Sequence, residues 1–146
     1  MEAIVQFELE PLAGDPRQSR LHSLSGAMGP VIQGSYLVGQ FRCDTGKYLI
    51  LAFESQNIDS TLYAHIIAPG LRLADSLELM PGPKGSGYSS LHISASDAIS
   101  FCFNSFPMNL RVVDPPKRFL KLAFKEVRRL SSSLAPHFLE LSMSKD

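Results

Sequence analysis

The chain has little cysteine and no long apolar run, and each of these absences excludes a class of protein. Two cysteines in 146 residues are too few for a disulfide-stapled scaffold. No stretch approaches the roughly 18 apolar residues that a membrane-spanning helix needs, and the acidic, alternating N-terminus is unlike a secretory signal. Asn-x-Ser/Thr glycosylation sites are also absent. We therefore expect a cytoplasmic protein that could lie peripherally at membranes, with Cys43 and Cys102 as free thiols.

What is present describes a folded domain whose charge is unevenly distributed. Apolar residues make up 45% of the chain and charged residues 19%, a balance typical of globular proteins. A length of 146 residues suffices for one domain with a sizeable core. The formal net charge is zero, but residues 1–110 hold 6 basic and 10 acidic residues, whereas residues 111–146 hold 8 and 4. An anionic partner is therefore open to the C-terminal part.

Short strand patterns separated by turn residues run through most of the chain. Residues 3–9 alternate apolar and polar side chains, as a half-buried strand does. Residues 10–33 are rich in proline and glycine and are predicted to be a long connection, with at most one short strand around residues 21–24. Further strands are predicted at about residues 35–43, 47–54, 60–68, 71–79, 88–95, 98–104 and 109–113. We expect a mostly β fold, with residues 1–114 forming an antiparallel β-sandwich.

The same patterns predict which side chains are inside and which lie at turns. The expected core residues share an apolar strand face or a central strand, and they are Phe7, Leu49, Leu51, Phe53, Ile66, Leu91, Ile93, Phe101 and Phe103. Asp59, Asp75 and Asp97 are each expected at a turn, where an aspartate side chain accepts hydrogen bonds from the nearby backbone.

After Pro115 and Pro116 the pattern changes to that of one basic amphipathic helix. At about 100° per residue, the apolar residues between 119 and 134 fall in one arc and basic residues fill the opposite arc. The basic face consists of Lys117, Arg118, Lys121, Lys125, Arg128 and Arg129. We expect residues 115–146 to form a C-terminal helix and tail of the same domain. Its basic face could be solvated, could lie on an anionic membrane surface or could contact a partner protein.

Two segments resemble the Golgi-dynamics (GOLD) domain, a β-sandwich of early-secretory cargo receptors and of cytosolic trafficking adaptors. Residues 48–67 (YLILAFESQNIDSTLYAHII) resemble the family's central strand, turn and second strand, and residues 87–106 (GYSSLHISASDAISFCFNSF) resemble its closing hairpin. The resemblance covers about residues 34–106 and implies a GOLD-like or jelly-roll-like sandwich that binds proteins without catalysis. The chain departs from the receptors in showing no signal peptide, no membrane span and no evident disulfide partner. The basic helix is not a family feature.

No cluster of residues in the sequence specifies a reaction, a cofactor or a metal. His22, His65, His92 and His137 lie on separate predicted elements, without metal-ligand spacing. Cys102 is predicted to be a buried structural residue, because a catalytic thiol needs a nearby base, which His65 or His92 would have to supply. We therefore expect no enzyme, no cofactor and no metal site.

These observations favour a non-catalytic protein–protein interaction module, in its leading version an adaptor in vesicle-mediated membrane trafficking. An alternative is a pleckstrin-homology-like (PH-like) barrel that binds phosphoinositides or anionic membranes, since that fold also ends in an amphipathic helix. A small enzyme with a site built on Cys102 and a histidine is a third class. Nucleic acid is not an expected partner, because the strands lack interleaved basic and aromatic residues.

Overall fold

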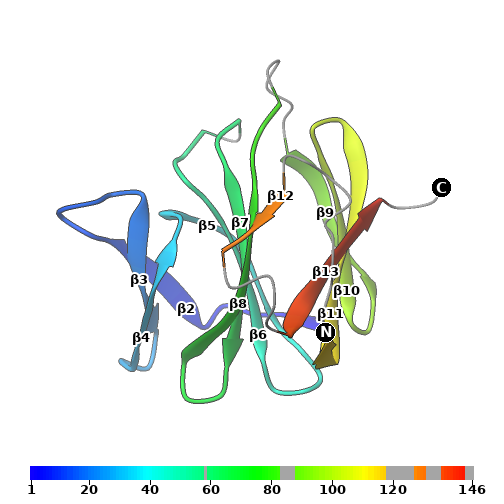
Figure 1. The fold of residues 1–146 in the computed structure, drawn as a ribbon. Coiled ribbons are helices and arrows are strands. Elements are labelled where there is room, and N and C mark those ends of the chain that lie inside the picture. Colours follow the sequence, from blue (N-terminus) through cyan, green and yellow to red (C-terminus); the bar gives the residue numbers. More distant parts are fainter. Residues whose placement is uncertain (58, 83–87, 118–126, 131–135, 144–146) are drawn as a thin grey trace.

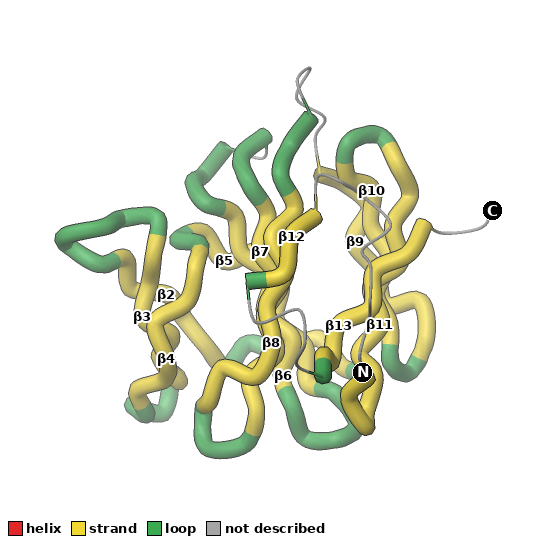
Figure 2. The backbone as a smooth tube through the Cα atoms, viewed as in Figure 1, coloured by secondary structure: helices red, strands yellow, loops and turns green. Residues whose placement is uncertain are grey.

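The protein is built from β-strands throughout the part of the chain that the structure describes. The computed structural model describes residues 1–57, 59–82, 88–117, 127–130 and 136–143. These residues contain strands and no helix (Figures 1 and 2). In chain order they are β1 (Glu2–Ala3), β2 (Phe7–Pro11), β3 (Gln18–Ser23), β4 (Met28–Gln33), β5 (Tyr36–Arg42), β6 (Tyr48–Phe53), β7 (Leu62–Ala68), β8 (Arg72–Leu79), β9 (Tyr88–Ala95), β10 (Ala98–Phe103), β11 (Phe106–Lys117), β12 (Val127–Arg129) and β13 (His137–Met143). The strand pairs are antiparallel, so the prediction of a mostly β, antiparallel fold is confirmed.

The strands form three sheets that lie in three layers (Figure 1). The central sheet has the order β1-β5-β6-β7-β8-β12. The closing sheet, β13-β11-β10-β9, lies on one side of it, and the N-terminal sheet, β2-β3-β4, lies on the other. A strand in the middle layer must be apolar on both faces, as β6 is: Leu49 and Leu51 pack toward the closing sheet and Ile50 toward the N-terminal sheet.

Two hydrophobic cores hold the layers together. The larger core lies between the central and closing sheets and contains the predicted residues Phe53, Phe101 and Phe103. The smaller core lies between the central and N-terminal sheets and consists of Phe7, Leu21, Ile32, Ile50 and Ile67. Of the nine predicted core residues, seven are buried; they are Phe7, Leu49, Leu51, Phe53, Ile66, Phe101 and Phe103.

The other two core predictions fall on the edge strand β9. Ile93 is 41% exposed, so its prediction is wrong, and Leu91 is only partly buried against the larger core. Among the described strands, β9 has a neighbour on one side only, and its pairing with β10 carries two register shifts. The alternating pattern of an edge strand therefore predicts one face but not how far that face extends over the core.

The predicted C-terminal helix is wrong. Residues 115–117 continue β11, and Val127–Arg129 form β12 at the edge of the central sheet, paired with residues 77–79 of β8. Residues 118–126 and 131–135 lie outside the described part. The alternative prediction of a PH-like barrel with a terminal helix is also wrong, since the described strands form three separate sheets. Over only three residues, such as 127–129, the sequence pattern of a helix cannot be told from that of a strand, and here pairing with β8 produces a strand.

Strands β4 and β13 have no counterpart among the predicted strands, and β3 is longer than the short strand predicted around residues 21–24. The segment predicted as a long connection holds the hairpin of β3 and β4, which carries Leu21 and Ile32 into the smaller core. Strand β13 lies in the segment predicted to be the tail of the helix, and its buried residues alternate at His137, Leu139 and Leu141. Strand β13 pairs with β11, so the end of the chain completes the closing sheet.

Candidate functional site

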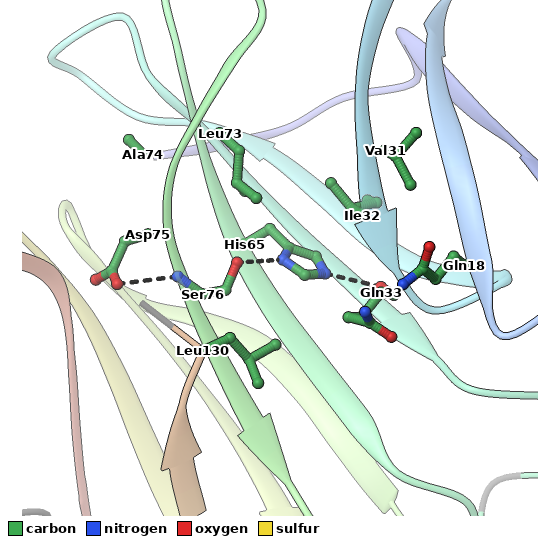
Figure 3. Close-up of a pocket in the computed structure, with 10 residues that line it drawn as sticks. All are labelled: Gln18, Val31, Ile32, Gln33, His65, Leu73, Ala74, Asp75, Ser76 and Leu130. Carbon is green, nitrogen blue, oxygen red and sulfur yellow. Dashed lines mark hydrogen bonds between the residues drawn. The ribbon is translucent and has the colours of Figure 1, made fainter. Parts of the chain in front are cut away.

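A cleft opens between the N-terminal sheet and the central sheet beside β8 and β12. Its inner half is a hollow of about 370 Å³, lined by both sheets and shown in Figure 3. Its outer half, about 360 Å³, is lined mostly by polar side chains. Gln18, Gln33 and Leu130 line both halves, so the two adjoin one another. We call this feature the inter-sheet cleft; each half is within the size range of small-ligand sites.

The inner half contains a chain of buried hydrogen bonds that joins the two sheets. His65 on β7 and Ser76 on β8 are cross-strand partners, and the Ser76 hydroxyl lies 2.6 Å from His65 Nδ1. His65 Nε2 lies 2.8 Å from the carbonyl oxygen of Gln33 on β4 (Figure 3). A carbonyl oxygen only accepts, so Nε2 carries the proton and Nδ1 accepts from the hydroxyl.

The pair has the spacing of a nucleophile and its base, but its environment favours a structural role. Both side chains are buried, and burial lowers the pKa of His65 from 6.5 to about 4. A base this weak is a poor proton acceptor near pH 7, where a catalytic base has a pKa matched to the working pH. Each ring nitrogen of His65 already has a partner. The His65–Ser76 pair therefore ties β4 to β7 and β8.

The outer half of the cleft carries charge around a buried tyrosine. Tyr63 lies directly across from Glu78 in the β7–β8 ladder, and Arg128 of β12 lies across from Glu78 on its other side. The Arg128 guanidinium donates to the Glu78 carboxylate at 2.6 Å. Burial, together with the carboxylates of Glu78 and Glu54, raises the pKa of Tyr63. The phenol is therefore held in its neutral form.

A second hollow follows the edge of β5, and we call it the edge groove. It measures about 550 Å³ and lies between residues 3–5, β5 and β9. Its exposed apolar walls include Val5, at 82% exposure, and Ile93, at 41%. At Gly39 the floor is close-packed, because an added Cβ would lie 3.2 Å from the Leu91 side chain. The groove is thus an open apolar surface along a strand edge.

On the face of the central sheet that meets the closing sheet, Asp75 anchors the last strand. Its carboxylate accepts from the ring of His137 and from the backbone N–H groups of Phe138 and Leu139, each at 2.9 Å. The Arg129 guanidinium lies 3.6 Å away. Asp75 lies in β8 and is buried, so its expected place at a turn is wrong. This carboxylate joins β8 to β13 and so links the central and closing sheets.

The six basic residues predicted as one face do not form one in the described chain. Lys117 is exposed at the end of β11. Arg128 points into the inter-sheet cleft toward Glu78, whereas Arg129 points to the other face, donating to the Leu139 carbonyl oxygen at 3.0 Å. The predictions for Arg118, Lys121 and Lys125 lie outside the described residues. Neighbours on a strand point to opposite faces, which separates the two arginines.

Of the two histidines considered for Cys102, only His92 lies near it on the closing sheet, since His65 is on β7 of the central sheet. Cys102 is half-buried, not buried as predicted, and it lines a small hollow of about 120 Å³ together with His92. His92 Nδ1 is bound to the carbonyl oxygen of Ser90, and no hydrogen bond joins Cys102 to a histidine among the described residues. Cys43 is buried, and both cysteines are free. Within the described chain no three His, Cys, Asp or Glu residues gather as metal ligands.

Several residues of these sites could not be singled out from the sequence. Tyr63, Ser76 and Glu78 are ordinary members of strand patterns, and only the register of β7 with β8 brings them opposite their partners. A signal existed for Asp75, because a carboxylate inside an apolar strand pattern must find partners when it is buried. Its partners come from β13, 62 to 64 residues away, and no local pattern reveals them.

Comparison of the chain with protein-family models, with curated proteins and with solved structures gave no match. Among the described residues there is no helix that is both long and apolar enough to cross a membrane. The functional argument therefore rests on the geometry of the edge groove and the inter-sheet cleft.

Proposed function

We propose that the protein is a non-catalytic binding module that takes up an extended segment of a partner protein as an added strand at the free edge of β5. The observation that carries the proposal is the short reach of β1. Strand β1 pairs only with Phe41 and Arg42, and Ile4 adds one backbone hydrogen bond to Gln40. Beyond that point residues 36–39 of β5 have β6 on one side and, among the described residues, no paired strand on the other.

The N-terminal segment is held away from this free edge by a single side chain. The Gln40 side-chain oxygen accepts from the backbone N–H groups of Gln6 at 2.8 Å and Phe7 at 2.9 Å. Its amide nitrogen donates to the Phe7 carbonyl oxygen at 3.2 Å. These bonds direct the chain out of the central sheet and into β2, which leaves the rest of the β5 edge open.

An open strand edge and an apolar groove together define the chemistry of the occupant. Unpaired N–H and C=O groups of a strand edge bind another extended backbone, which is strand addition. The groove walls at Val5, Val38 and Ile93 are apolar. A segment that alternates apolar residues toward these walls with polar residues toward water satisfies both requirements.

The test is a selection of random dodecapeptides displayed on phage against the wild-type protein. Ile93→Lys places a charge in the edge groove, and Leu24→Lys is its matched control, since Leu24 is 56% exposed and does not line the groove. We expect selected peptides that alternate apolar residues, bind wild type and Leu24→Lys equally, and bind Ile93→Lys at least tenfold more weakly. Failure to obtain any peptide that distinguishes Ile93→Lys from Leu24→Lys would refute the proposal.

Two further measurements examine the strand itself. Methylating alternate peptide nitrogens should abolish binding in one of the two registers and leave it in the other, because only one set of N–H groups faces β5. Amide hydrogen exchange of residues 36–39 should slow when the peptide is bound. A peptide that tolerates both methylation patterns would bind by its side chains alone, contrary to the proposal.

A further inference from the structure

The edge groove opens onto the margin of the larger core, between the free part of β5 and the edge strand β9. Val38 of β5 and Leu91 of β9 pack against that core and also line the groove. Phe41 belongs to the core, is 4% exposed and lines the groove as well. Two further lining residues, Ile93 and Val5, are apolar yet 41% and 82% exposed. Apolar surface therefore extends from the interior of the sandwich to the outside at this margin.

Gly39 determines where a side chain of an added strand can enter this margin. A Cβ built on Gly39 would lie 3.1 Å from the Phe41 ring and 3.2 Å from the Leu91 side chain. The face of Gly39 that carries no side chain is therefore the one that looks toward Phe41 and Leu91. Residues directly opposite each other on paired strands project to the same face of the sheet. A partner residue opposite Gly39 thus directs its side chain toward Phe41 and Leu91, with no Gly39 side chain beside it.

The described walls of the edge groove offer no charged partner to an entering side chain. No Asp, Glu, Lys or Arg is among the described residues that line it. The Gln40 amide is engaged by the backbone of residues 6 and 7, and His92 Nδ1 is engaged by a backbone carbonyl oxygen. The charges of Glu2 and Arg42, where β1 pairs with β5, are paired with each other. A polar side chain that is buried without a partner costs free energy, so the side chain that enters here is apolar.

From these observations, and on the basis of the proposed strand addition, we infer that the segment bound at β5 carries an aromatic side chain directly opposite Gly39, with its ring over Gly39 and against Leu91 and Ile93. An aromatic cross-strand neighbour covers the bare backbone of a glycine in an edge strand. The ring also meets the Phe41 ring edge to face, a contact that an aliphatic side chain cannot make. Gly39 and Leu91 are then the residues that determine which partner segments bind.

The experiment uses the phage-selected dodecapeptides whose binding is lost in Ile93→Lys. We expect them to share one aromatic residue at a fixed place among their apolar positions. In a synthetic peptide of this set, leucine at that place should weaken binding to the wild-type protein about threefold to tenfold, and alanine at least about tenfold. Nuclear Overhauser contacts between the ring and the Leu91 methyl groups should place the ring in the groove. Groove-dependent peptides without a shared aromatic residue would overturn the inference and leave strand addition standing, whereas a selection without groove-dependent peptides would refute strand addition and the inference with it.

A double-mutant cycle, measured by fluorescence anisotropy, tests the position opposite Gly39. Gly39→Ala adds a Cβ where the ring is expected to lie, so it should weaken binding of the aromatic peptide about tenfold and change binding of its alanine version less than about twofold. Retained binding of the alanine version also shows that the variant is folded. Gly14→Ala is the matched control, since a Cβ added at Gly14 meets nothing within 4 Å and Gly14 does not line the groove. Equal losses for the two peptides in Gly39→Ala, or an equal loss in Gly14→Ala, would mean that the ring does not lie over Gly39.

Discussion

Replacing Asp75 is the most direct test of how the closing sheet is attached to the central sheet. Asp75→Ala removes the acceptor for the His137 ring and for two backbone N–H groups of β13, all at 2.9 Å. A buried donor without its acceptor costs about 1–3 kcal/mol. Three such donors, with partial relief by water, give an expected loss of about 4–6 kcal/mol, a large part of the 5–15 kcal/mol of a typical domain.

The control is Asp97→Ala, which removes an aspartate from a solvated setting. The Asp97 carboxylate is 49% exposed and lies 3.4 Å from Arg111, so the loss should stay below about 1 kcal/mol. Asp75→Asn should be intermediate between these variants, because one oxygen remains to accept from the backbone of β13 while the charge disappears. We expect it to lower the free energy of unfolding by about 2 kcal/mol.

Urea titrations followed by far-ultraviolet circular dichroism measure these differences, provided that the slope with urea stays constant between variants. Hydrogen exchange adds a local reading, since the amides of Phe138 and Leu139 should lose protection first in Asp75→Ala. If Asp75→Ala were within 1 kcal/mol of Asp97→Ala, the carboxylate would not hold β13, and the packing of Leu139 and Leu141 would have to account for the attachment.

Three other predictions follow from buried side chains. Because the pKa of His65 is lower in the folded protein, about 4, than its ordinary 6.5, the unfolded state binds more protons between these values. Stability should therefore fall by about 3 kcal/mol as the pH drops from 6.5 to 4, and His65→Gln should remove that part of the pH dependence in urea titrations. Phe101→Ala should cost about 3–5 kcal/mol and Ile93→Ala less than about 1 kcal/mol, which thermal and urea unfolding would check. In thiol labelling of the native protein Cys102 should react first, since burial raises the pKa of Cys43 to about 11; faster labelling of Cys43 would contradict its burial.

The part of the fold that was predictable from the sequence is the part in which one pattern corresponds to one element. The alternating and apolar runs of residues 35–54 and 60–79 correspond to β5, β6, β7 and β8 within a few residues at each end. These strands are neighbours in the central sheet and are joined by short turns. Where sequence neighbours are also spatial neighbours, local patterns and turn residues carry most of the information.

The failures occurred where pairing over a long distance decides the structure. Strand β12 has only three residues, and it becomes a strand because β8 offers its edge to Val127 and Arg129. The sequence does have helical periodicity through these residues, but periodicity is a local property and carries no information about a free strand edge elsewhere in the fold. The same holds for β3 and β4, whose proline and glycine residues indicated a connection although they form a hairpin over the central sheet.

The three-layer arrangement keeps the edge groove and the inter-sheet cleft apart. The edge groove lies where β5 and β9 meet, and Val38 and Leu91 at its floor pack against the larger core. The inter-sheet cleft lies over the opposite face of the central sheet, and its inner wall depends on the Gln33–His65 bond to the N-terminal sheet. Hollows that share no lining residue should respond independently to substitution. A change at Glu54, which lines the outer half of the cleft, should therefore leave peptide selection at the edge groove unaltered.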